Sequence, residues 1–503
     1  MTFQRYFLMR PLLFCRHFFA VICVALSGFA HATAGDLDVT FGVAGKVMTQ
    51  IGSGALGYGM VLQADGNILL AGSCGSASKS NFCLVRYNVN GSVDTDFAAT
   101  GKIITAVGTL NDYAVAVAIQ TDGNIVTVGY CQNSSNNFDF CVTRHTRSGS
   151  LDSSFGNAGR VVTTVGNGDD YATKVFLQPD GKIVVLGYCM SGSGYWNFCL
   201  VRYSANGSLD STFGSGGKVT TALGSGHAVG TAAVLQSDGK ILIAGSCANA
   251  FGGRGFCLAR YGTNGSLDIG FNGNGKVLPD GTAAESSVVF DIALQLTGKS
   301  VVVGHCTTGG RTQFCAARYN PSGSLDISFG SSGRLATSVG TAYDIGQGVA
   351  VQVDGKILLA GYCGNDANED FCLVRFDLNG AIDTNFGIGG KVIAPVGSGD
   401  DSATSIALQS DGKIVLGGYC SEGADTKFCL ARFRGASTNC RLDIDGDGKI
   451  LATTDGLIYT RIALGISGSA VLNGVTFPLG AVRTSWADIR SYLVDECGLS
   501  LGP

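Results

Sequence analysis

Short apolar segments separated by turn residues make up most of the chain. In the stretch that begins at Leu151, segments rich in apolar residues alternate with segments of Gly, Asn, Asp and Ser, and they cover residues 160–165, 174–178, 182–189 and 198–203. Segments of this length and composition predict four β-strands. The third segment is continuously apolar over residues 183–186, which is typical of a strand that is covered on both faces.

This four-strand pattern occurs seven times. Each copy starts with Leu-Asp or a close variant, a Phe follows three residues after the Asp, and successive Asp residues are 56, 58, 58, 58, 58 and 57 positions apart. The copies begin near residues 37, 93, 151, 209, 267, 325 and 382. Asp-Gly joins the second and third strands in every copy except the fifth, which has Thr297-Gly298. Because Asp-Gly tolerates the positive φ angles of a tight turn, these two strands are predicted to form a β-hairpin.

Seven such units are compatible with two all-β architectures. Four-stranded units of roughly 40–60 residues typically form β-propeller blades that pack face to face, whereas a linear β-solenoid normally has a shorter period. We therefore predict a seven-bladed propeller of four-stranded blades over residues 36–434.

The two ends of the repeat region indicate how the ring closes. The last copy stops at Gly435 without a following Leu-Asp segment, and the first copy is preceded by an unattached Leu37-Asp38. An Arg on the fourth strand occurs in all seven copies, and in the first six the Leu-Asp carboxylate follows eight residues later. We expect Arg–Asp pairs between blades, and closure of the ring then requires Arg432 to pair with Asp38.

Cysteines follow the same repeat. Each copy has one Cys at the end of its third strand and one at the start of its fourth: Cys74/Cys83, Cys131/Cys141, Cys189/Cys199, Cys247/Cys257, Cys306/Cys315, Cys363/Cys372 and Cys420/Cys429. Because a β-hairpin places these positions opposite each other, we expect seven disulfides. Cys440 and Cys497 are left over after the repeats and are expected to pair with each other.

The N-terminus has the features of a signal peptide. Three Arg residues precede or flank an apolar stretch over residues 18–26, and the small-x-small sequence Ala30-His31-Ala32 follows it. Cleavage after residue 32 changes the net charge from −4 to −7, which disfavours binding to nucleic acid. No later segment is apolar for long enough to span a membrane. The protein is predicted to be secreted, periplasmic or attached to the cell surface.

The repeat resembles a known family. Segments such as LDSTFGSGGKV, LQSDGKILIAGSC and FCLARY, which occur at 209–219, 235–247 and 256–261, are similar to the delta-60 repeat. The resemblance covers about residues 36–434 and implies a β-propeller. It implies no particular activity, because none is attached to the family in general.

A different module follows over residues 436–503. Asp443, Asp445 and Asp447 alternate before Gly448, as in a loop that binds Ca²⁺ through oxygen ligands. The carbonyl of Lys449 is the next expected ligand, and Asp455 is expected to close the site. The loop and the following apolar segment resemble a dockerin-type, EF-hand-like module, although Asp455 stands at loop position 13 and no second loop follows. The alternative is a solvated acidic turn. Helices are expected after Asp455 and over residues 486–494, giving a small, mainly α-helical module.

The first functional hypothesis is a secreted, non-catalytic binding or scaffold propeller. Its partner would be an extracellular protein or polysaccharide, and the C-terminal module would serve attachment or interaction. Tyr195-Trp196, an aromatic pair on a hairpin loop, is the candidate contact for a sugar.

The alternative is an extracellular carbohydrate-active enzyme that uses carboxylates near the propeller axis. The acidic pairs Asp169-Asp170 and Asp400-Asp401 are its candidates, although they occupy corresponding loops and so are explained by repetition. His145, His227 and His305 fall in different copies without a shared motif, and the chain contains no nucleophile elbow, zinc motif or phosphate loop. These observations favour a non-catalytic role.

Overall fold

The computed structural model describes residues 33–76, 79–249, 252–279, 286–365, 367–435, 444–445, 447, 451, 453–463 and 466–493. The chain divides into two compact units, of which one is Ala34–Ser437 and the other includes Thr438–Pro503. Each unit is described by itself below.

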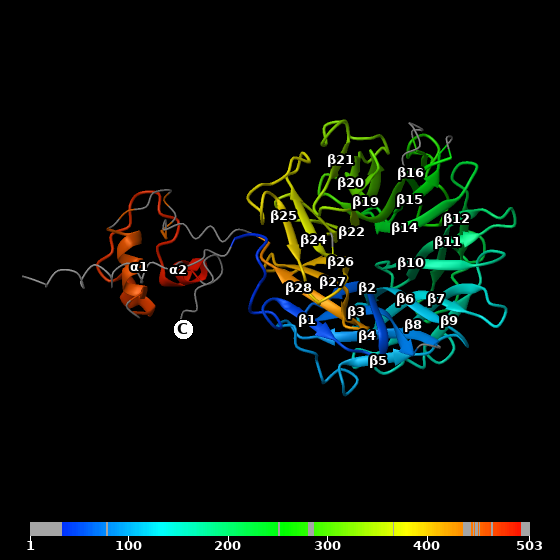
Figure 1. Ribbon diagram of the computed structural model, residues 1–503, viewed down its shortest axis with the longest axis horizontal. Helices are drawn as coiled ribbons and strands as arrows, with labels where there is room; N and C mark the ends of the chain where they lie inside the picture. Colours follow the sequence, from blue (N-terminus) through cyan, green and yellow to red (C-terminus); the bar gives the residue numbers. More distant parts are fainter. Residues whose placement is uncertain are drawn as a thin grey trace, which may run out of the picture. The chain divides into compact units, whose positions relative to one another are not determined.

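The first unit is a ring of seven four-stranded antiparallel sheets, which confirms the predicted propeller (Figure 1). Blade 1 contains β2 (Ser53–Leu62), β3 (Ile68–Ser76), β4 (Lys79–Tyr87) and β5 (Lys102–Thr105). Blade 2 contains β6 (Asp112–Ile119), β7 (Ile125–Gln132), β8 (Phe138–His145) and β9 (Arg160–Thr163). Blade 3 contains β10 (Asp170–Leu177), β11 (Ile183–Met190), β12 (Trp196–Tyr203) and β13 (Lys218–Thr221). Blade 4 contains β14 (Ala228–Leu235), β15 (Ile241–Ala248), β16 (Arg254–Tyr261) and β17 (Lys276–Val277). Blade 5 contains β18 (Ser287–Leu294), β19 (Ser300–Thr308), β20 (Arg311–Tyr319) and β21 (Arg334–Thr337). Blade 6 contains β22 (Asp344–Val351), β23 (Ile357–Gly364), β24 (Glu369–Phe376) and β25 (Lys391–Ala394).

Blade 7 is completed by the start of the chain. Its first three strands are β26 (Asp401–Leu408), β27 (Ile414–Glu422) and β28 (Asp425–Phe433), and its fourth is β1 (Lys46–Thr49). The pairing of Lys46 with Ala431 and of Thr49 with Phe428 closes the ring as predicted (Figure 1). The first strand of every sequence copy is therefore the outer strand of the preceding blade.

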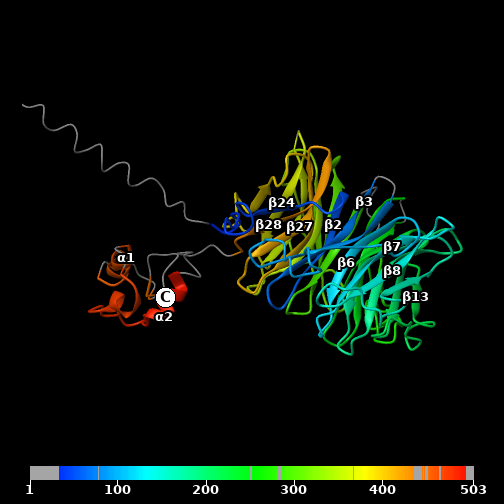
Figure 2. The same cartoon turned by 90° about the horizontal axis from the view of Figure 1, so that it is seen from below.

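The inner strands begin earlier than their apolar segments indicate. β10 starts at Asp170 rather than at residue 174, and Asp170 pairs with Cys189 of β11. A β-bulge lies between Ala172 and Lys174. The stretch before the bulge reads as a loop because it is polar, but its backbone continues the sheet. Figure 2 shows β6, β7 and β8 side by side along blade 2.

The second strand of each blade is covered on both faces. In β11, Ile183 and Val185 belong to the core that blade 3 shares with blade 2, whereas Val184 and Leu186 belong to the core shared with blade 4. Successive side chains of a strand point to opposite faces, so a continuously apolar strand stabilises two blade interfaces at once.

The recurring Arg connects neighbouring blades. The Nε of Arg202 donates to Asp210 at 2.8 Å, and its guanidinium lies 4.4 Å from the ring centroid of Phe213. Its Nη1 also donates to the carbonyl of Thr263 in the next blade. The six other Arg residues make the same Asp and Phe contacts, which confirms the predicted pairs, and Arg432 lies 2.9 Å from Asp38 across the closure.

All seven predicted disulfides within the blades are present. Their Cα–Cα distances are 5.7–5.9 Å. The bonded pairs are those expected from the repeat, namely Cys74–Cys83, Cys131–Cys141, Cys189–Cys199, Cys247–Cys257, Cys306–Cys315, Cys363–Cys372 and Cys420–Cys429. Cys440 and Cys497 lie outside the described residues.

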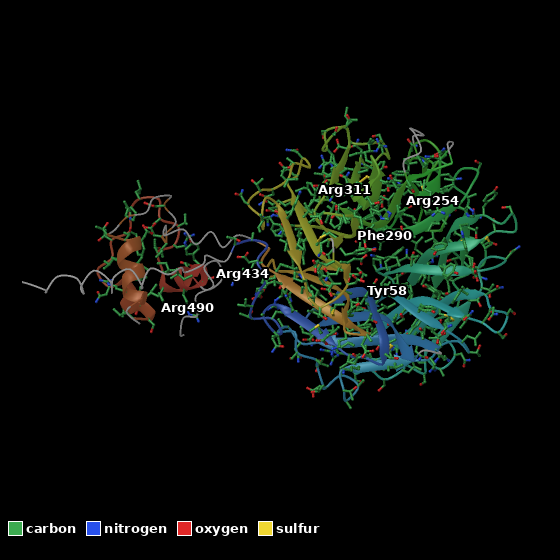
Figure 3. The ribbon with its side chains drawn as sticks, in the orientation of Figure 1. Tyr58, Arg254, Phe290, Arg311, Arg434 and Arg490 are labelled. Atoms are coloured by element: carbon green, nitrogen blue, oxygen red, sulfur yellow. A yellow bond between two sulfur atoms is a disulfide. The ribbon has the colours of Figure 1, made fainter. Side chains whose placement is uncertain are left out.

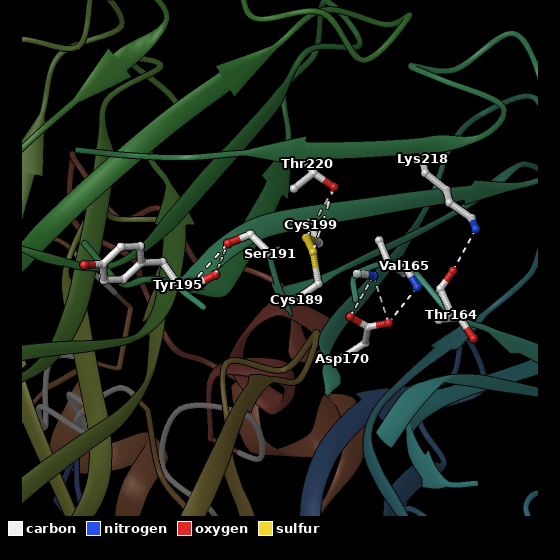
Figure 4. Close-up of a disulfide and its surroundings, with 10 residues drawn as sticks. Thr164, Val165, Asp170, Cys189, Ser191, Tyr195, Cys199, Lys218 and Thr220 are labelled. Atoms are coloured by element: carbon white, nitrogen blue, oxygen red, sulfur yellow. Dashed lines mark hydrogen bonds between the residues drawn. A yellow bond between two sulfur atoms is a disulfide. The ribbon is translucent and has the colours of Figure 1, made fainter. Parts of the chain in front are cut away.

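The predicted places of these cysteines in the hairpin are wrong in two respects. The second Cys of a pair lies inside its strand and not at the start, because β12 begins at Trp196, before Cys199. The two Cys also do not stand directly opposite each other. Cys189 is opposite Asn197 and Cys199 is opposite Gly187, so the bond runs diagonally between the strands (Figure 4). The same two corrections apply to Cys83, Cys141, Cys257, Cys315, Cys372 and Cys429, each of which lies within its strand and opposite a Gly.

Crowding explains why a Gly stands opposite the second Cys. A Cβ at Gly187 would lie 1.9 Å from the carbonyl oxygen of Tyr171 on the inner strand. The equivalent glycines of the other six blades would place a Cβ 1.7–2.2 Å from a carbonyl oxygen of the inner strand: Gly72, Gly129, Gly245, Gly304, Gly361 and Gly418. The position therefore excludes a Cys or any other side chain, and the disulfide forms along the diagonal.

The described part of the second unit has a small helical core. It contains α1 (Asp455–Ala463), a 3₁₀ helix η1 (Gly468–Leu472) and α2 (Trp486–Ser491). Buried Ile444, Ile458 and Ile489 are part of its core. Among the described residues of the whole chain, no helix is long and apolar enough to cross a membrane. The predicted signal peptide, residues 1–32, lies outside the described residues.

Candidate functional site: an aromatic axial cavity

Two carboxylates of the predicted calcium loop, Asp445 and Asp455, lie at the start of α1. Asp445 and Asp455 are fully buried. Asp455 accepts hydrogen bonds from the backbone amides of Ile444, Asp445 and Leu451 and from the hydroxyl of Thr454. Its carboxylate therefore holds the loop against the helix.

The other predicted ligands are only partly described. Asp447 donates its backbone amide to Asp445 at 3.2 Å, whereas Asp443 and Lys449 lie outside the described residues. Within the part of the chain that the structure describes, no group of three or more His, Cys, Asp or Glu side chains is arranged to hold a metal ion.

The disulfide cysteines have a structural role. The second Cys of every pair is buried: Cys83, Cys141, Cys199, Cys257, Cys315, Cys372 and Cys429. None of the paired cysteines lines the central cavity of the propeller. They hold the hairpin of each blade and take no part in the candidate site.

The acidic pairs considered for catalysis also have structural roles. Asp170 is fully buried and accepts hydrogen bonds from the backbone amides of Val165 and Gly166 (Figure 4). Burial raises the pKa of Asp170 to about 6, although these two amides act in the opposite direction. Asp401 is buried and bonded in the same way in blade 7, and its pKa is also raised to about 6.

The first member of each acidic pair links two blades. Asp169 accepts from the backbone amide of Phe138 in blade 2, and Asp400 accepts from that of Glu369 in blade 6. None of these four carboxylates lines the central cavity of the propeller. The acidic pairs thus hold the loops between blades, and they do not converge near the axis.

The inner strands of all seven blades surround a central cavity of about 520 Å³, called the axial cavity here. Tyrosines contribute much of its lining: Tyr58, Tyr130, Tyr171, Tyr188, Tyr362 and Tyr419. Phe290 also lines it, and Figure 3 shows Tyr58 and Phe290 near the middle of the ring. Concave pockets that combine aromatic walls with convergent polar groups are typical ligand sites.

Aromatic residues of blades 2 and 3 extend this lining toward the hairpin tips that carry the disulfides. Six contacting rings, called the aromatic cluster here, belong to Tyr113, Tyr130, Phe138, Tyr171, Tyr188 and Trp196. The ring centroids of Tyr130 and Tyr171 lie 4.9 Å apart across the boundary of the two blades, and those of Tyr188 and Trp196 lie 5.1 Å apart. All six rings are half-buried.

The aromatic cluster does not follow from the repeat. In each of the two blades, the three rings occupy the same three positions. The first lies on the inner strand, the second lies on the second strand directly before the Cys, and the third lies at the start of the third strand. Blade 4 has Val229, Ser246 and Arg254 at these positions. Only blades 2 and 3 carry an aromatic residue at all three. A feature confined to two adjacent blades of a repeated architecture is a better candidate for function than one that recurs in every blade.

The electrostatics of the axial cavity are simple. Burial raises the pKa of Tyr58 and of Tyr188 to about 12 and also raises that of Tyr130, so these phenols are neutral O–H donors. Among the lining residues, Lys174 and Asp291 carry charge, and Lys174 Nζ lies 3.0 Å from Asp291 Oδ1.

The three histidines do not form a common site. His145 is buried in blade 2, and its Nε2 lies 3.0 Å from the hydroxyl of Thr105. His227 packs on Tyr195 with ring centroids 5.3 Å apart, and His305 packs on Phe290. Tyr195 is 44% exposed and lies outside the aromatic cluster. Of the predicted pair Tyr195-Trp196, only Trp196 joins the cluster.

Sequence reasoning missed the tyrosines of the axial cavity. Tyr171 lies in a segment read as a loop, and Tyr188 directly precedes a Cys that drew attention to the disulfide instead. The available signal was the variation between copies, because the residue before this Cys is Tyr in blades 2, 3, 6 and 7 and Ser or His in the others.

The fold and the axial cavity define the chain as a repeat β-propeller. Seven segments match the family model described as "Domain of unknown function (DUF5122) beta-propeller", at residues 63–97, 120–155, 178–213, 236–271, 295–329, 352–386 and 409–435. The family match thus falls on the same seven copies that form the blades.

Several solved structures are similar to this chain at low sequence identity and with TM-scores below 0.5. The polysaccharide lyase Uly1 is 15% identical with a TM-score of 0.44, over 78% of this chain and 92% of that chain. A PL25 ulvan lyase bound to -[GlcA(1-4)Rha3S]- is 11% identical with a TM-score of 0.45, over 78% and 96%. Sqt1 of Chaetomium thermophilum is 13% identical with a TM-score of 0.39, over 76% and 96%. No curated protein matches the sequence.

Proposed function

We propose that this protein is an exported binding propeller that holds a saccharide at the aromatic end of the axial cavity. The observation that carries the proposal is the aromatic cluster of blades 2 and 3, which occupies non-repeating positions and continues into the cavity lining. Flat aromatic rings offer a large, rigid apolar surface at low entropic cost. Such a surface suits the C–H face of a sugar ring, while phenol groups bind its hydroxyls.

Polar groups around the axial cavity support this ligand class. Thr173, Thr231 and Thr404 donate their hydroxyl hydrogens to backbone carbonyls of neighbouring blades, so their oxygens remain as acceptors. Tyrosine O–H groups supply donors. A lining that combines aromatic faces with neutral donors and acceptors matches a polyhydroxylated ligand better than a strongly charged one.

Export is part of the proposal. Seven disulfides are typical of proteins that fold in an oxidising compartment, and they support the signal peptide predicted at residues 1–32.

The catalytic alternative needs two carboxylates near the axis. Among the residues that line the axial cavity, Asp291 is the one carboxylate, and it is paired with Lys174. The non-catalytic function is therefore the one that we propose.

Binding is tested with a glycan array followed by calorimetry on the mature protein. Trp196→Ala removes a ring at the edge of the aromatic cluster, and we expect it to weaken saccharide binding by about 10-fold, which corresponds to ~1.4 kcal/mol. Tyr343→Ala is the matched control, because Tyr343 is an exposed aromatic residue of blade 6 outside the cluster. Equal affinities of wild type and Trp196→Ala for every bound glycan would contradict the proposal.

We also propose that the C-terminal loop binds Ca²⁺ through the side chains of Asp443, Asp445 and Asp447 and the carbonyl of Lys449. The fully buried carboxylate of Asp445 supports this proposal, because a divalent cation offsets the cost of burying such charge. Asp455 is already saturated with hydrogen bonds and is assigned to hold the loop.

Removal of calcium tests this site. Chelation should lower the melting temperature of the C-terminal unit and expose it to protease, and Asp445→Asn should reproduce the effect. Asp425→Asn, at an exposed position of the propeller, is the control. An unchanged melting temperature after chelation would rule out a stabilising calcium ion.

A further inference from the structure

The axial cavity contains one ion pair that the repeat does not require. Lys174 lies on β10 of blade 3 and Asp291 on β18 of blade 5, so their contact at 3.0 Å skips blade 4. The five other inner strands have small residues at the position after the bulge: Gly59, Ala116, Ala232, Gly348 and Ser405. The small residues leave room, and the two long side chains meet in the cavity.

The two partners are held differently. The Oδ2 of Asp291 also accepts the backbone amide of Val349 in blade 6, at 3.2 Å, and the Asp291 side chain is only 16% exposed. The Lys174 side chain is 38% exposed, and an ammonium group has three N–H donors. The carboxylate is thus anchored by the propeller, while the ammonium has donors that face the cavity.

The stability of the fold does not explain why an ion pair is present at this position. A partly exposed ion pair contributes little to folding, and a buried one is often no better than apolar residues of similar size. The pair also lines the same axial cavity as Tyr171, Tyr188 and Phe290. Its position within an aromatic site points to ligand recognition.

We propose that the Lys174–Asp291 pair is the polar anchor of the axial cavity and selects uncharged saccharides. This inference rests on the proposed function and names its ligand class. The ammonium donates to sugar hydroxyl oxygens, and the carboxylate accepts from sugar hydroxyls. Because the pair is net neutral, a uronate or sulfated sugar would lose water from its anionic group without gaining an unpaired cation in return.

The test compares neutral and acidic ligands of the same linkage. The probes are β-1,4-mannohexaose with β-1,4-hexamannuronate, and cellohexaose with β-1,4-hexaglucuronate, each measured by calorimetry. Wild type should bind the neutral member of at least one pair about 10-fold more tightly than its uronate. Asp291→Asn leaves Lys174 unpaired, so it should reduce this ratio by about 10-fold or reverse it.

Two further variants separate recognition from folding. The exchanged pair Lys174→Asp/Asp291→Lys keeps the site neutral and should retain the preference for neutral sugars. Lys174→Met makes the site negative, and it should weaken uronate binding further. A merely structural pair would change the melting temperature in these variants and leave the neutral-to-uronate ratio unchanged.

The outcomes are distinct. Equal or tighter binding of the uronates by wild type would overturn the inference, as would an unchanged ratio in Asp291→Asn. If Trp196→Ala still weakens binding in that case, the proposed function stands and only the ligand class is wrong. If wild type binds none of the four oligosaccharides, nor any other glycan on the array, both the inference and the proposed function fail.

Discussion

The Asp38–Arg432 pair offers a direct test of how the ring closes, because no disulfide among the described residues joins β1 to the rest of blade 7. Each of the seven described disulfides lies within one blade, and β1 joins β28 over four paired residues. The side chains of Arg432 and Asp38 are 4% and 3% exposed. Removal of one partner from a buried pair leaves the other charge unpaired and costs about 3–5 kcal/mol. We expect Asp38→Asn to lower the free energy of unfolding by about 3 kcal/mol.

The matched control is Asp210→Asn. Arg202 and Asp210 form the same contact at 2.8 Å, with 5% and 8% of their side chains exposed. They are 8 residues apart in the chain, whereas Asp38 and Arg432 are 394 apart. For a flexible chain, the entropic cost of loop closure differs by about 3.5 kcal/mol between these separations, as an upper limit. The closing strand should therefore detach far more readily than an internal outer strand once its Asp–Arg pair is lost.

Hydrogen exchange and urea unfolding measure this difference. Asp38→Asn should accelerate amide exchange in β1 and β28 under conditions where the other blades stay protected, whereas Asp210→Asn should not expose β13 selectively. The double variant Asp38→Leu/Arg432→Met should recover stability, because no unpaired charge remains. The reasoning is refuted if the two single variants show the same exchange in β1, or if Asp38→Asn differs from wild type by less than about 1 kcal/mol.

Two further predictions concern the repeat itself. Burial lowers the pKa of His145 to about 4 from 6.5, so the unfolded chain binds a proton that the folded chain does not between these pH values, and stability falls as the pH falls through this window. In His145→Tyr, the new phenol should bond to Thr105 as Tyr203 does to Thr163, at 2.8 Å. The variant should lose about 3 kcal/mol less stability than wild type as the pH falls through this window. Parallel pH profiles of variant and wild type would contradict this. Replacing both Cys189 and Cys199 by Ala, which opens a loop of separation 10, should cost about 2–3 kcal/mol in urea unfolding, and unchanged stability would argue against a structural role of the bond.

Much of the propeller could be predicted because its determinants are local. The Asp-Gly turns, the apolar second strands and the Cys spacing repeat within each copy, and the unmatched Leu37-Asp38 and Arg432 predicted closure of the ring. The details that were wrong depend on register. The bulge at Thr173 moves the start of the inner strand, and the diagonal offset of Cys189 and Cys199 follows from how β11 pairs with β12. Neither is visible in composition or spacing.

The candidate site depended on contacts between copies. Trp196 was identified as a candidate from its place on a hairpin loop, but its contacts with Tyr171 and Tyr188 were not. These residues are separated by turns in the sequence, and their rings meet because three neighbouring strands place them at the same end of blade 3. The acidic pairs drew attention for the opposite reason, since carboxylates are conspicuous in a sequence even when, like Asp170, they only accept backbone hydrogen bonds.

The amino-acid sequence alone predicts the number of blades, the hairpins, the seven disulfide partners and the Arg–Asp contacts, because each is set by residues close in the repeat or by its fixed period. The position of the site depends on contacts between blades. Lys174 and Asp291 are 117 positions apart and contact each other only because the ring brings the inner strands of blades 3 and 5 to one axial cavity. A periodic sequence specifies its blades one by one, whereas the cavity is a property of the closed ring.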